Sequence, residues 1–266
     1  MASTTVTETA PTSVKSALRT VELLELLASS PRPMSLAEVH RELPYPKSSL
    51  LVLLRTLVGR GWLQFEPGAG RYSIGLRALL AGSSYLERDL VAQFSGPLLR
   101  RLGEELDETV HVARLDGSDV IYLASRESTH HLRSTSRVGR RLPANACSLG
   151  KALLSARSDD VVDALLPKEL ESRTPHTLAD RPSLFADLAK TRERGWAREI
   201  GENTPGLACV AVAIPHGGSA VDAISCSIPI EKFDPEVEAR VVSALRATAA
   251  ELSGLVDLAS GADNAS

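Results

Sequence analysis

Apolar residues recur at three- and four-residue spacing along three stretches near the start of the chain, a pattern that predicts three amphipathic helices. Pro44 and Pro46 separate the second stretch from the third, because proline cannot continue a helix. Three helices of this kind would enclose one small hydrophobic core. The residues that form the stripes are Val14, Ala17, Leu18, Val21, Leu24 and Leu27; Leu36, Val39, His40 and Leu43; and Leu50, Leu53, Leu54, Leu57 and Val58.

After these helices the apolar period becomes that of paired strands. Residues 62–65 and 71–74 flank a turn that contains Gly68 and Gly70, which predicts a β-hairpin. Helix, tight turn, helix and hairpin in this order outline a winged helix-turn-helix over residues 13–75, and such a unit binds double-stranded DNA. A compact helical domain that binds no DNA is the alternative.

The third helix is expected to enter the major groove of operator DNA, because it is the second of the two helices joined by the turn. Ser35 followed by Glu38 predicts a capping box at the start of the helix before it. The predicted operator contacts are residues of the third helix that lie off its leucine stripe, together with one arginine of the hairpin. They are Lys47, Ser48, Ser49, Val52, Arg55 and Arg71.

The remainder of the chain alternates between helical and extended patterns. Residues 76–90 predict a helix that links two domains, and residues 91–258 predict the second domain. Apolar runs on either side of the turns at 116–119 and 216–219 predict two hairpins within it. With helical patterns between the hairpins and a long closing helix over 235–258, the second domain is predicted to be α+β, with helices packed on an antiparallel sheet.

Charge is unevenly distributed along the chain. All 266 residues together carry a formal net charge of −3, which by itself would not suggest a nucleic-acid partner. Residues 13–75 hold eight Lys/Arg and five acidic residues, a surplus of +3, so the remainder carries −6. Because phosphate contacts depend on local basic residues, this division is compatible with DNA binding. The small surplus favours a homodimer or homotetramer, in which linked copies bind DNA together.

Cysteine use and hydropathy set the expected location. Cys147, Cys209 and Cys226 form no CxxC motif and suggest no disulfide framework. No apolar run approaches membrane-spanning length and no signal peptide precedes the first helix, so a cytoplasmic protein without a membrane partner is expected. The small and polar residues 1–12 and 259–266 predict disordered tails.

Six segments carry a resemblance to a known family. They are VKSALRTVELLELLA, PKSSLLVLLRTLVGRGWLQ, RYSIGLRALLAG, VGRRLPANACSLGKALLSA, RERGWAREIGENTPGLACVAVAIP and AISCSIP, in the family's order. The chain resembles the IclR family of transcriptional regulators over nearly its full length. The resemblance implies an N-terminal winged helix, a linker helix, a GAF-like effector domain, and dimers or tetramers. It also implies a regulator, more often a repressor, that senses a small organic or aromatic acid. Leu51 and Val52 stand where the family usually places His or Tyr followed by Arg.

By this resemblance, the turn Leu149-Gly150-Lys151 borders the effector pocket. The turn begins an apolar helix, and the free amides and dipole of a helix start favour an anion. It is not a nucleotide-binding Walker A loop, because Asn145 and Ala152 occupy positions that such a loop gives to other residues. A glycine kept for close packing and a solvated lysine are the alternative.

The second part of the implied pocket lies on predicted strands. Ser225 and Ser227 are two residues apart, so they share one face of a strand, while Cys226 points to the other face and is expected in the core. The family's pattern places both serines, with Cys209 and Glu199, around the ligand. Hydroxyl groups can donate to a carboxylate, so a small carboxylate is the predicted effector. Two serines bonded only to neighbouring strand groups are the alternative.

Motifs of the common enzyme classes are missing from the sequence, which contains no GxSxG, HExxH or GxGxxG. The histidines at 111, 130, 131, 176 and 216 lack the spacing of metal ligands. No enzymatic activity, cofactor or metal is therefore predicted. The alternative function is a DNA-binding domain fused to a small enzyme, or to an oligomerisation domain that binds no ligand.

Overall fold

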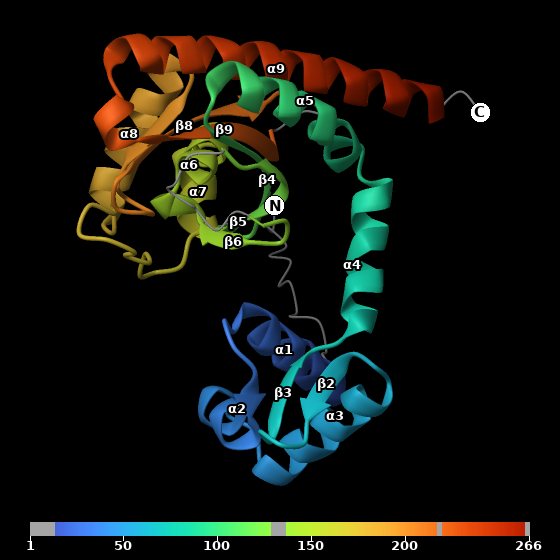
Figure 1. Cartoon of the computed structure of the whole chain (residues 1–266). Coiled ribbons are helices and arrows are strands. Elements are labelled where there is room, and N and C mark those ends of the chain that lie inside the picture. Colours follow the sequence, from blue (N-terminus) through green and yellow to red (C-terminus); the bar gives the residue numbers. More distant parts are fainter. Residues whose placement is uncertain (1–13, 129–136, 217–219, 264–266) are drawn as a thin grey trace, which may run out of the picture. The chain divides into compact units, whose positions relative to one another are not determined.

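The computed structural model describes residues 14–128, 137–216 and 220–263 and divides into two compact units. Unit 1 spans Met1–Tyr85 and unit 2 spans Leu86–Ser266. The division falls within helix α4, which occupies the segment expected to link the domains (Figure 1).

Unit 1 combines three helices with a small antiparallel sheet. Its elements are α1 (Lys15–Ser29), β1 (Met34–Ser35), α2 (Leu36–Glu42), α3 (Lys47–Gly59), β2 (Leu63–Glu66), β3 (Arg71–Ile74) and the first part of α4 (Leu76–Arg88). The strand order is β1-β3-β2, and β2 and β3 form the hairpin of the wing. The predicted winged helix-turn-helix is confirmed. Strand β1 was not predicted, because two residues are too few to show a period.

The capping box predicted at the start of α2 is present. Glu38 N donates to Ser35 Oγ at 3.3 Å, and Ser35 N donates to Glu38 Oε2 at 2.7 Å. The bond from the Ser35 amide, followed by one from the Arg32 guanidinium, lowers the pKa of Glu38 to about 2. The box satisfies amides at the helix start and fixes where the helix-turn-helix begins.

The apolar face predicted for α1 is wrong in its first half. Leu23 and Leu27 are buried in the core of unit 1, whereas Val14, Leu18 and Val21 are exposed. Only the C-terminal half of α1 reaches the core that α2, α3 and the sheet build, so the earlier apolar residues have no surface to cover within unit 1. On α2, His40 is likewise exposed.

Unit 2 is built around a six-stranded antiparallel sheet with the order β6-β5-β4-β9-β8-β7. Its strands are β4 (Thr109–Asp116), β5 (Asp119–Arg126), β6 (Arg141–Pro143), β7 (Ala197–Ile200), β8 (Leu207–Ile214) and β9 (Asp222–Pro229). Its helices after α4 are α5 (Leu90–Leu106), α6 (Ser148–Ser155), α7 (Asp159–Leu165), α8 (Arg181–Arg194) and α9 (Pro235–Asp263), with two short 3-10 turns at Ala144–Ala146 and Ile230–Lys232.

Helices cover both faces of this sheet. The long helix α9 and helix α5 pack on one face, and α6, with α7 and α8 beside it, packs on the other (Figure 1). Each face has its own apolar core, and Cys226 lies fully buried in the core under α5 and α9, as predicted. The predicted α+β fold is confirmed, and the opposite face of β9 is left for the side chains of a polar site.

Two details of the expected organisation differ in the structure. Helix α9 continues to Asp263, so residues 259–263 are helical and not part of a disordered tail; small residues such as Ala and Ser do not by themselves end a helix. Residues 264–266 and the tail expected at 1–12 lie outside the described residues. The linking helix ends at Arg88, because Asp89 caps α5 through a 2.9 Å bond from Ala92 N.

Candidate functional site

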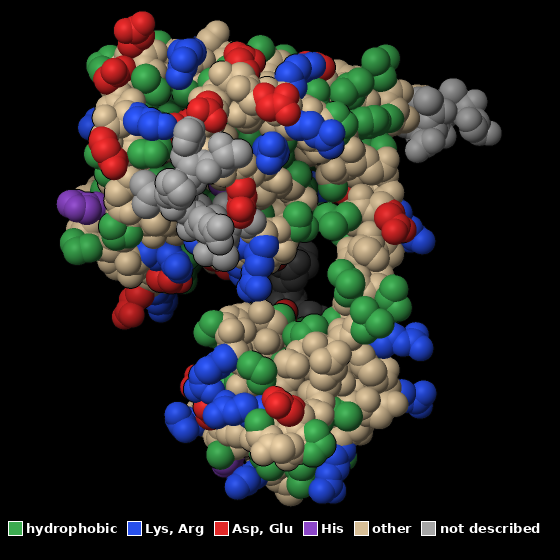
Figure 2. All heavy atoms as spheres, in the orientation of Figure 1, with side chains coloured by type: hydrophobic (Ala, Val, Ile, Leu, Met, Phe, Trp, Pro, Cys, Tyr) green, Lys and Arg blue, Asp and Glu red, His purple; other side chains and the backbone are tan. Residues whose placement is uncertain are grey.

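Helix α3 turns a hydrophilic face to solvent. Leu50, Leu54 and Leu57 are buried on its inner side, as the leucine stripe predicted. Lys47, Ser48, Val52 and Arg55 are exposed on its outer side. Lysine and arginine side chains are visible at the surface of unit 1 in Figure 2.

Two of the six predicted DNA contacts are engaged within unit 1. Ser49 is half-buried, and its Oγ accepts a 3.4 Å bond from Arg19 Nη1. Arg71 Nη1 donates to Pro33 O at 2.8 Å and to Glu38 Oε2 at 3.1 Å. Both side chains therefore help to hold the turn and the wing in place. Sequence periodicity could not reveal this, because the partners lie 30 or more residues away in sequence.

A small polar cavity lies in unit 2 between the start of α6 and the α6 face of the sheet. Glu199 on β7, Cys209 on β8 and Ser227 on β9 stand side by side across neighbouring strands, since Glu199 pairs with Cys209 and Cys209 with Ser227. Ser225 lies two residues further along β9 on the same face. Of the predicted effector residues, the structure brings Leu149, Glu199, Cys209, Ser225 and Ser227 together around this cavity.

The cavity is also lined by six residues that the sequence did not lead us to predict. They are Tyr122, Cys147, Ser148, Asn203, Thr204 and Leu207. Cys147 and Ser148 directly precede the turn that was singled out, so a wider reading of that turn would have found them. Tyr122 and the loop residues come from segments whose proximity depends on the tertiary fold.

Gly150 serves close packing. A Cβ at this position would lie 2.2 Å from Ala144 O, much closer than any real side-chain contact. Only glycine therefore lets α6 lie this close to the 3-10 turn at Ala144–Ala146. Its amide donates to Cys147 Sγ at 3.4 Å, which caps the helix. Gly150 does not line the cavity, in agreement with the packing alternative, and the first-turn residues that do are Ser148 and Leu149.

Lys151 does not line the cavity. Its side chain is fully buried, and Nζ lies 2.8 Å from Glu202 Oε1 and 3.0 Å from Asp187 Oδ2. It is therefore neither an effector contact in this structure nor the solvated lysine of the alternative. It joins the start of α6 to α8 and to the loop after β7, and its partners lie 36 and 51 residues away.

The walls of the cavity offer mostly uncharged hydrogen-bonding groups. Burial raises the pKa of the Glu199 carboxyl, although its Oε2 accepts a 2.7 Å bond from Glu202 N. Burial also raises the pKa of Cys147 to about 12 and that of Cys209 well above its ordinary value, so both thiols stay protonated near neutral pH. Cys209 Sγ donates to Ser227 Oγ at 3.2 Å.

The cavity is nearly closed. Its volume is about 10 Å³, which is room for about one water molecule. A ligand larger than water can enter only if the lining side chains or the loop at Asn203 and Thr204 move apart. Binding would then be coupled to a change in the structure around β8 and β9.

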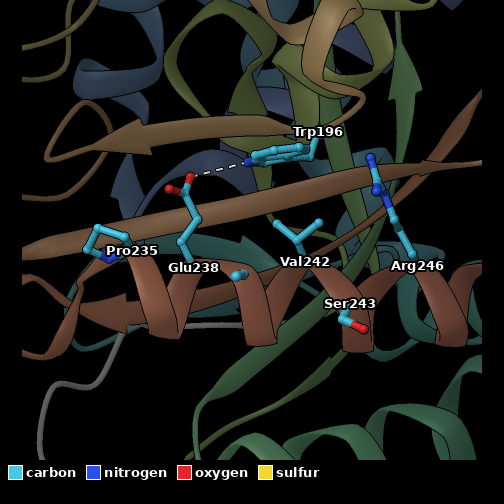
Figure 3. A pocket seen from close by; sticks show the side chains of 7 residues that line it. Trp196, Pro235, Glu238, Val242, Ser243 and Arg246 are labelled. Atoms are coloured by element: carbon cyan, nitrogen blue, oxygen red, sulfur yellow. Dashed lines mark hydrogen bonds between the residues drawn. The ribbon is translucent and has the colours of Figure 1, made fainter.

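A larger hollow of about 360 Å³ lies at the surface beside α9 (Figure 3). Trp196 Nε1 donates to Glu238 Oε1 at 3.2 Å across it, and the Arg246 guanidinium lies 5.4 Å from the indole centroid. None of the predicted site residues lines this hollow.

Two other kinds of feature are absent from the described part of the chain. Within residues 14–128, 137–216 and 220–263, no three or more His, Cys, Asp or Glu are grouped to hold a metal ion. His130 and His131 lie outside the described residues. No helix among the described ones has both the length and the apolar character to cross a membrane.

The two units together define a class of protein. A winged helix-turn-helix with an exposed reading helix is typical of proteins that bind DNA, and the α+β unit adds a small buried polar cavity. This two-unit organisation is that of a transcriptional regulator.

Comparison with known proteins identifies the family. The model for the IclR helix-turn-helix domain matches residues 16–67, and the model for the C-terminal domain of bacterial transcriptional regulator IclR matches residues 83–254. The chain belongs to the IclR family of transcriptional regulators.

Individual relatives agree with this assignment. The transcriptional repressor IclR of Escherichia coli K12 is 35% identical over 224 residues, which cover 83% of this chain and 82% of that protein. The crystal structure of an IclR transcriptional regulator from Alicyclobacillus acidocaldarius matches with a TM-score of 0.80 at 25% identity, over 91% of this chain and 99% of that one. An IclR homologue from Microbacterium hydrocarbonoxydans, crystallised with 4-hydroxybenzoate, shares the fold with a TM-score of 0.76 at 22% identity, over 91% and 99% of the two chains.

Proposed function

We propose that this regulator is a repressor whose operator binding is controlled by a small carboxylate held in the cavity of unit 2. The observation that carries the proposal is the convergence of serine and cysteine residues from β8, β9 and the start of α6 on one buried cavity. The repressor named IclR and the homologue with 4-hydroxybenzoate support it by analogy. Its named relatives are regulators, so we propose no enzymatic activity and a cytoplasmic location beside the DNA.

The carboxylate would lie with its oxygens towards the first turn of α6. The amides of Ser148 and Leu149 belong to the helix start, where the dipole favours negative charge. The hydroxyls of Ser225 and Ser227 would donate to the same group from the sheet. Burial raises the pKa of Glu199, so its carboxyl takes up a proton more readily than an exposed one, and in the protonated form it would donate to the ligand.

The serine pair gives a direct test of the ligand site. Ser225→Ala combined with Ser227→Ala should weaken carboxylate binding at least ~10-fold, because hydrogen bonds to a charged group contribute ~1.5–3 kcal/mol each. Isothermal titration with acetate, pyruvate and 4-hydroxybenzoate measures the loss. Ser243→Ala, on the exposed side of α9, is the matched control and should bind as wild type does. Equal affinities of the double variant and the control would contradict the proposed site.

A chain of ion pairs offers a route from the cavity to the linking helix. Arg114 Nη2 and Nε donate to the two carboxylate oxygens of Asp222, at 2.7 and 2.8 Å, and Asp222 lies three residues before Ser225 on β9. The same guanidinium pairs with Asp89, the residue that caps α5 directly after α4. We infer that a ligand-dependent shift of β9 is passed through Arg114 and Asp89 to the C-terminal end of α4. A change in position of that end would favour one arrangement of the DNA-binding units of two copies over another, which is a population shift.

On the DNA side, we propose that Lys47, Ser48, Val52 and Arg55 contact the operator from the exposed face of α3. Ser49 and Arg71 would act by holding the turn and the wing, because Ser49 Oγ and Arg71 Nη1 already take part in hydrogen bonds within unit 1. Base and phosphate contacts of this kind are the ones expected of a helix in the major groove.

We further propose that the chain is at least a homodimer through α4. This helix has no buried residue, and it exposes Leu76, Leu79, Leu80 and Tyr85. These side chains offer apolar surface on α4 that a second copy could cover. A homotetramer would need an additional contact.

The assembly proposal predicts a change of mass in a charged variant. Leu79→Glu with Leu80→Glu should reduce the assembly, because carboxylates resist burial against apolar surface. Light scattering at micromolar concentration should give at least twice 28.4 kDa for the wild type and less for the variant. Val161→Glu, at an exposed position of α7, is the control and should keep the wild-type mass. A wild-type mass of 28.4 kDa would exclude the dimer.

A further inference from the structure

The exposed face of α3 carries one large apolar side chain among hydrophilic ones. Val52 is 64% exposed, whereas the leucines of α3 and its second valine, Val58, are buried or half-buried. A β-branched residue is a weaker helix former than alanine or arginine, so the valine brings no advantage to the helix itself. Its side chain is available to a partner of unit 1.

Val52 lies at the centre of the face proposed to read DNA. Ser48 is one turn before it and Arg55 three residues after it, so the three side chains share one face of the helix. The neighbouring Thr56 is turned back on the helix, because its Oγ1 donates to Val52 O at 2.8 Å. Val52 is therefore the residue of this face that offers apolar surface without a hydrogen-bonding group.

The charge around Val52 favours a nucleic-acid partner over an apolar protein surface. Lys47 and Arg55 are exposed on the same helix, and α3 contains no acidic residue. Positive charge with no compensating carboxylate is complementary to phosphates. An apolar protein surface would instead have to remove water from these two charges without pairing them.

In the major groove, thymine presents an apolar group, the methyl at C5, whereas the other base edges present hydrogen-bond donors and acceptors. We propose that Val52 contacts the 5-methyl group of a thymine in each operator half-site and thereby selects a T·A pair at that position. A base edge that offers only polar groups would lose water against the valine and find no partner there. The proposal rests on the proposed role of α3 as the reading helix.

Replacement of thymine by 2′-deoxyuridine removes the methyl group and leaves the hydrogen-bonding pattern unchanged. The full-length protein first selects its operator from a random pool of duplexes, and each thymine of one half-site is then replaced singly. At one thymine, the replacement should weaken wild-type binding about four-fold, as expected for one methyl-sized group returned to water. For Val52→Ala the same replacement should change the affinity less than two-fold, a threshold taken as about half that free energy.

Two further variants make the test specific. Val52→Thr keeps one methyl group and should retain an intermediate discrimination between thymine and deoxyuridine. Arg55→Ala should weaken binding to both duplexes equally and leave the four-fold ratio unchanged. Suppose that the wild type binds its operator tightly while Val52→Ala abolishes the preference for thymine over deoxyuridine at none of the thymines. That result would overturn the proposal but leave α3 as the reading helix. If neither Arg55→Ala nor Val52→Ala changes the affinity for the selected operator, the role of α3 itself is overturned.

Discussion

Lys151→Met is expected to lower the free energy of unfolding of unit 2 by about 3–5 kcal/mol, the cost of removing one partner from a buried ion pair. The substitution keeps the length and apolar stem of the side chain but removes the ammonium group. Glu202 and Asp187 would then face each other across the space that Nζ occupies, at 2.8 and 3.0 Å from it in the wild type. Two partly buried carboxylates without a cation repel each other and resist desolvation.

Denaturant unfolding of the full chain measures this loss. The sequence has two tryptophans, Trp62 in unit 1 and Trp196 in unit 2, so in a Trp62→Phe background the fluorescence of Trp196 reports unit 2 alone. Lys190→Met, at an exposed position of α8, is the matched control and should change stability by less than ~0.5 kcal/mol. Adding Glu202→Gln to Lys151→Met should recover part of the loss. A variant as stable as the control would contradict the role given to the buried ion pairs.

Gly150→Ala should destabilise the same unit by about 3 kcal/mol or more, at the upper end of what overpacking costs. The added Cβ would meet Ala144 O at 2.2 Å and Ala144 Cα at 2.3 Å, and backbone atoms cannot rotate away as a side chain does. The start of α6 would have to move, and the wall of the cavity would move with it. We therefore expect weaker carboxylate binding as well as lower stability.

Gly254→Ala is the control for this substitution. Gly254 lies in α9 with no atom within 4 Å of an added Cβ, so alanine should stabilise the helix by up to ~1 kcal/mol. The same Trp196 fluorescence measurement separates the two variants. If both glycines tolerate alanine equally well, the packing role of Gly150 is wrong.

Local patterns predicted the elements whose signal lies within one segment. The leucine stripe of α3, the Ser35–Glu38 capping box and the hairpin of the wing could all be deduced, because spacing and capping act over a few residues. Long strands such as β8 and β9 were also predicted from their apolar runs. The short strands β6 and β7 were not, because three or four residues show no clear period.

What could not be predicted depends on partners far away in sequence. Lys151 has the same local sequence whether it faces a ligand or a buried carboxylate, and only the fold brings Asp187 and Glu202 to it. The sequence suggests that Arg71 is available to contact DNA, whereas in the structure its Nη1 donates to Pro33 O and to Glu38 Oε2. The pocket on β8 and β9 was proposed from family resemblance, since strand spacing shows that Ser225 and Ser227 share a face but not what that face meets.

The central claim is that the cavity of unit 2 controls operator binding by unit 1. Its most direct test is the affinity for the selected operator, measured by fluorescence anisotropy with and without the carboxylate that binds tightest among acetate, pyruvate and 4-hydroxybenzoate. We predict that this carboxylate weakens operator binding by the wild type at least ~5-fold, the lower range of allosteric coupling. At a carboxylate concentration near the wild-type dissociation constant, the operator affinity of the Ser225→Ala/Ser227→Ala variant should change much less. A carboxylate that binds the wild type but leaves its operator affinity unaltered would contradict the account.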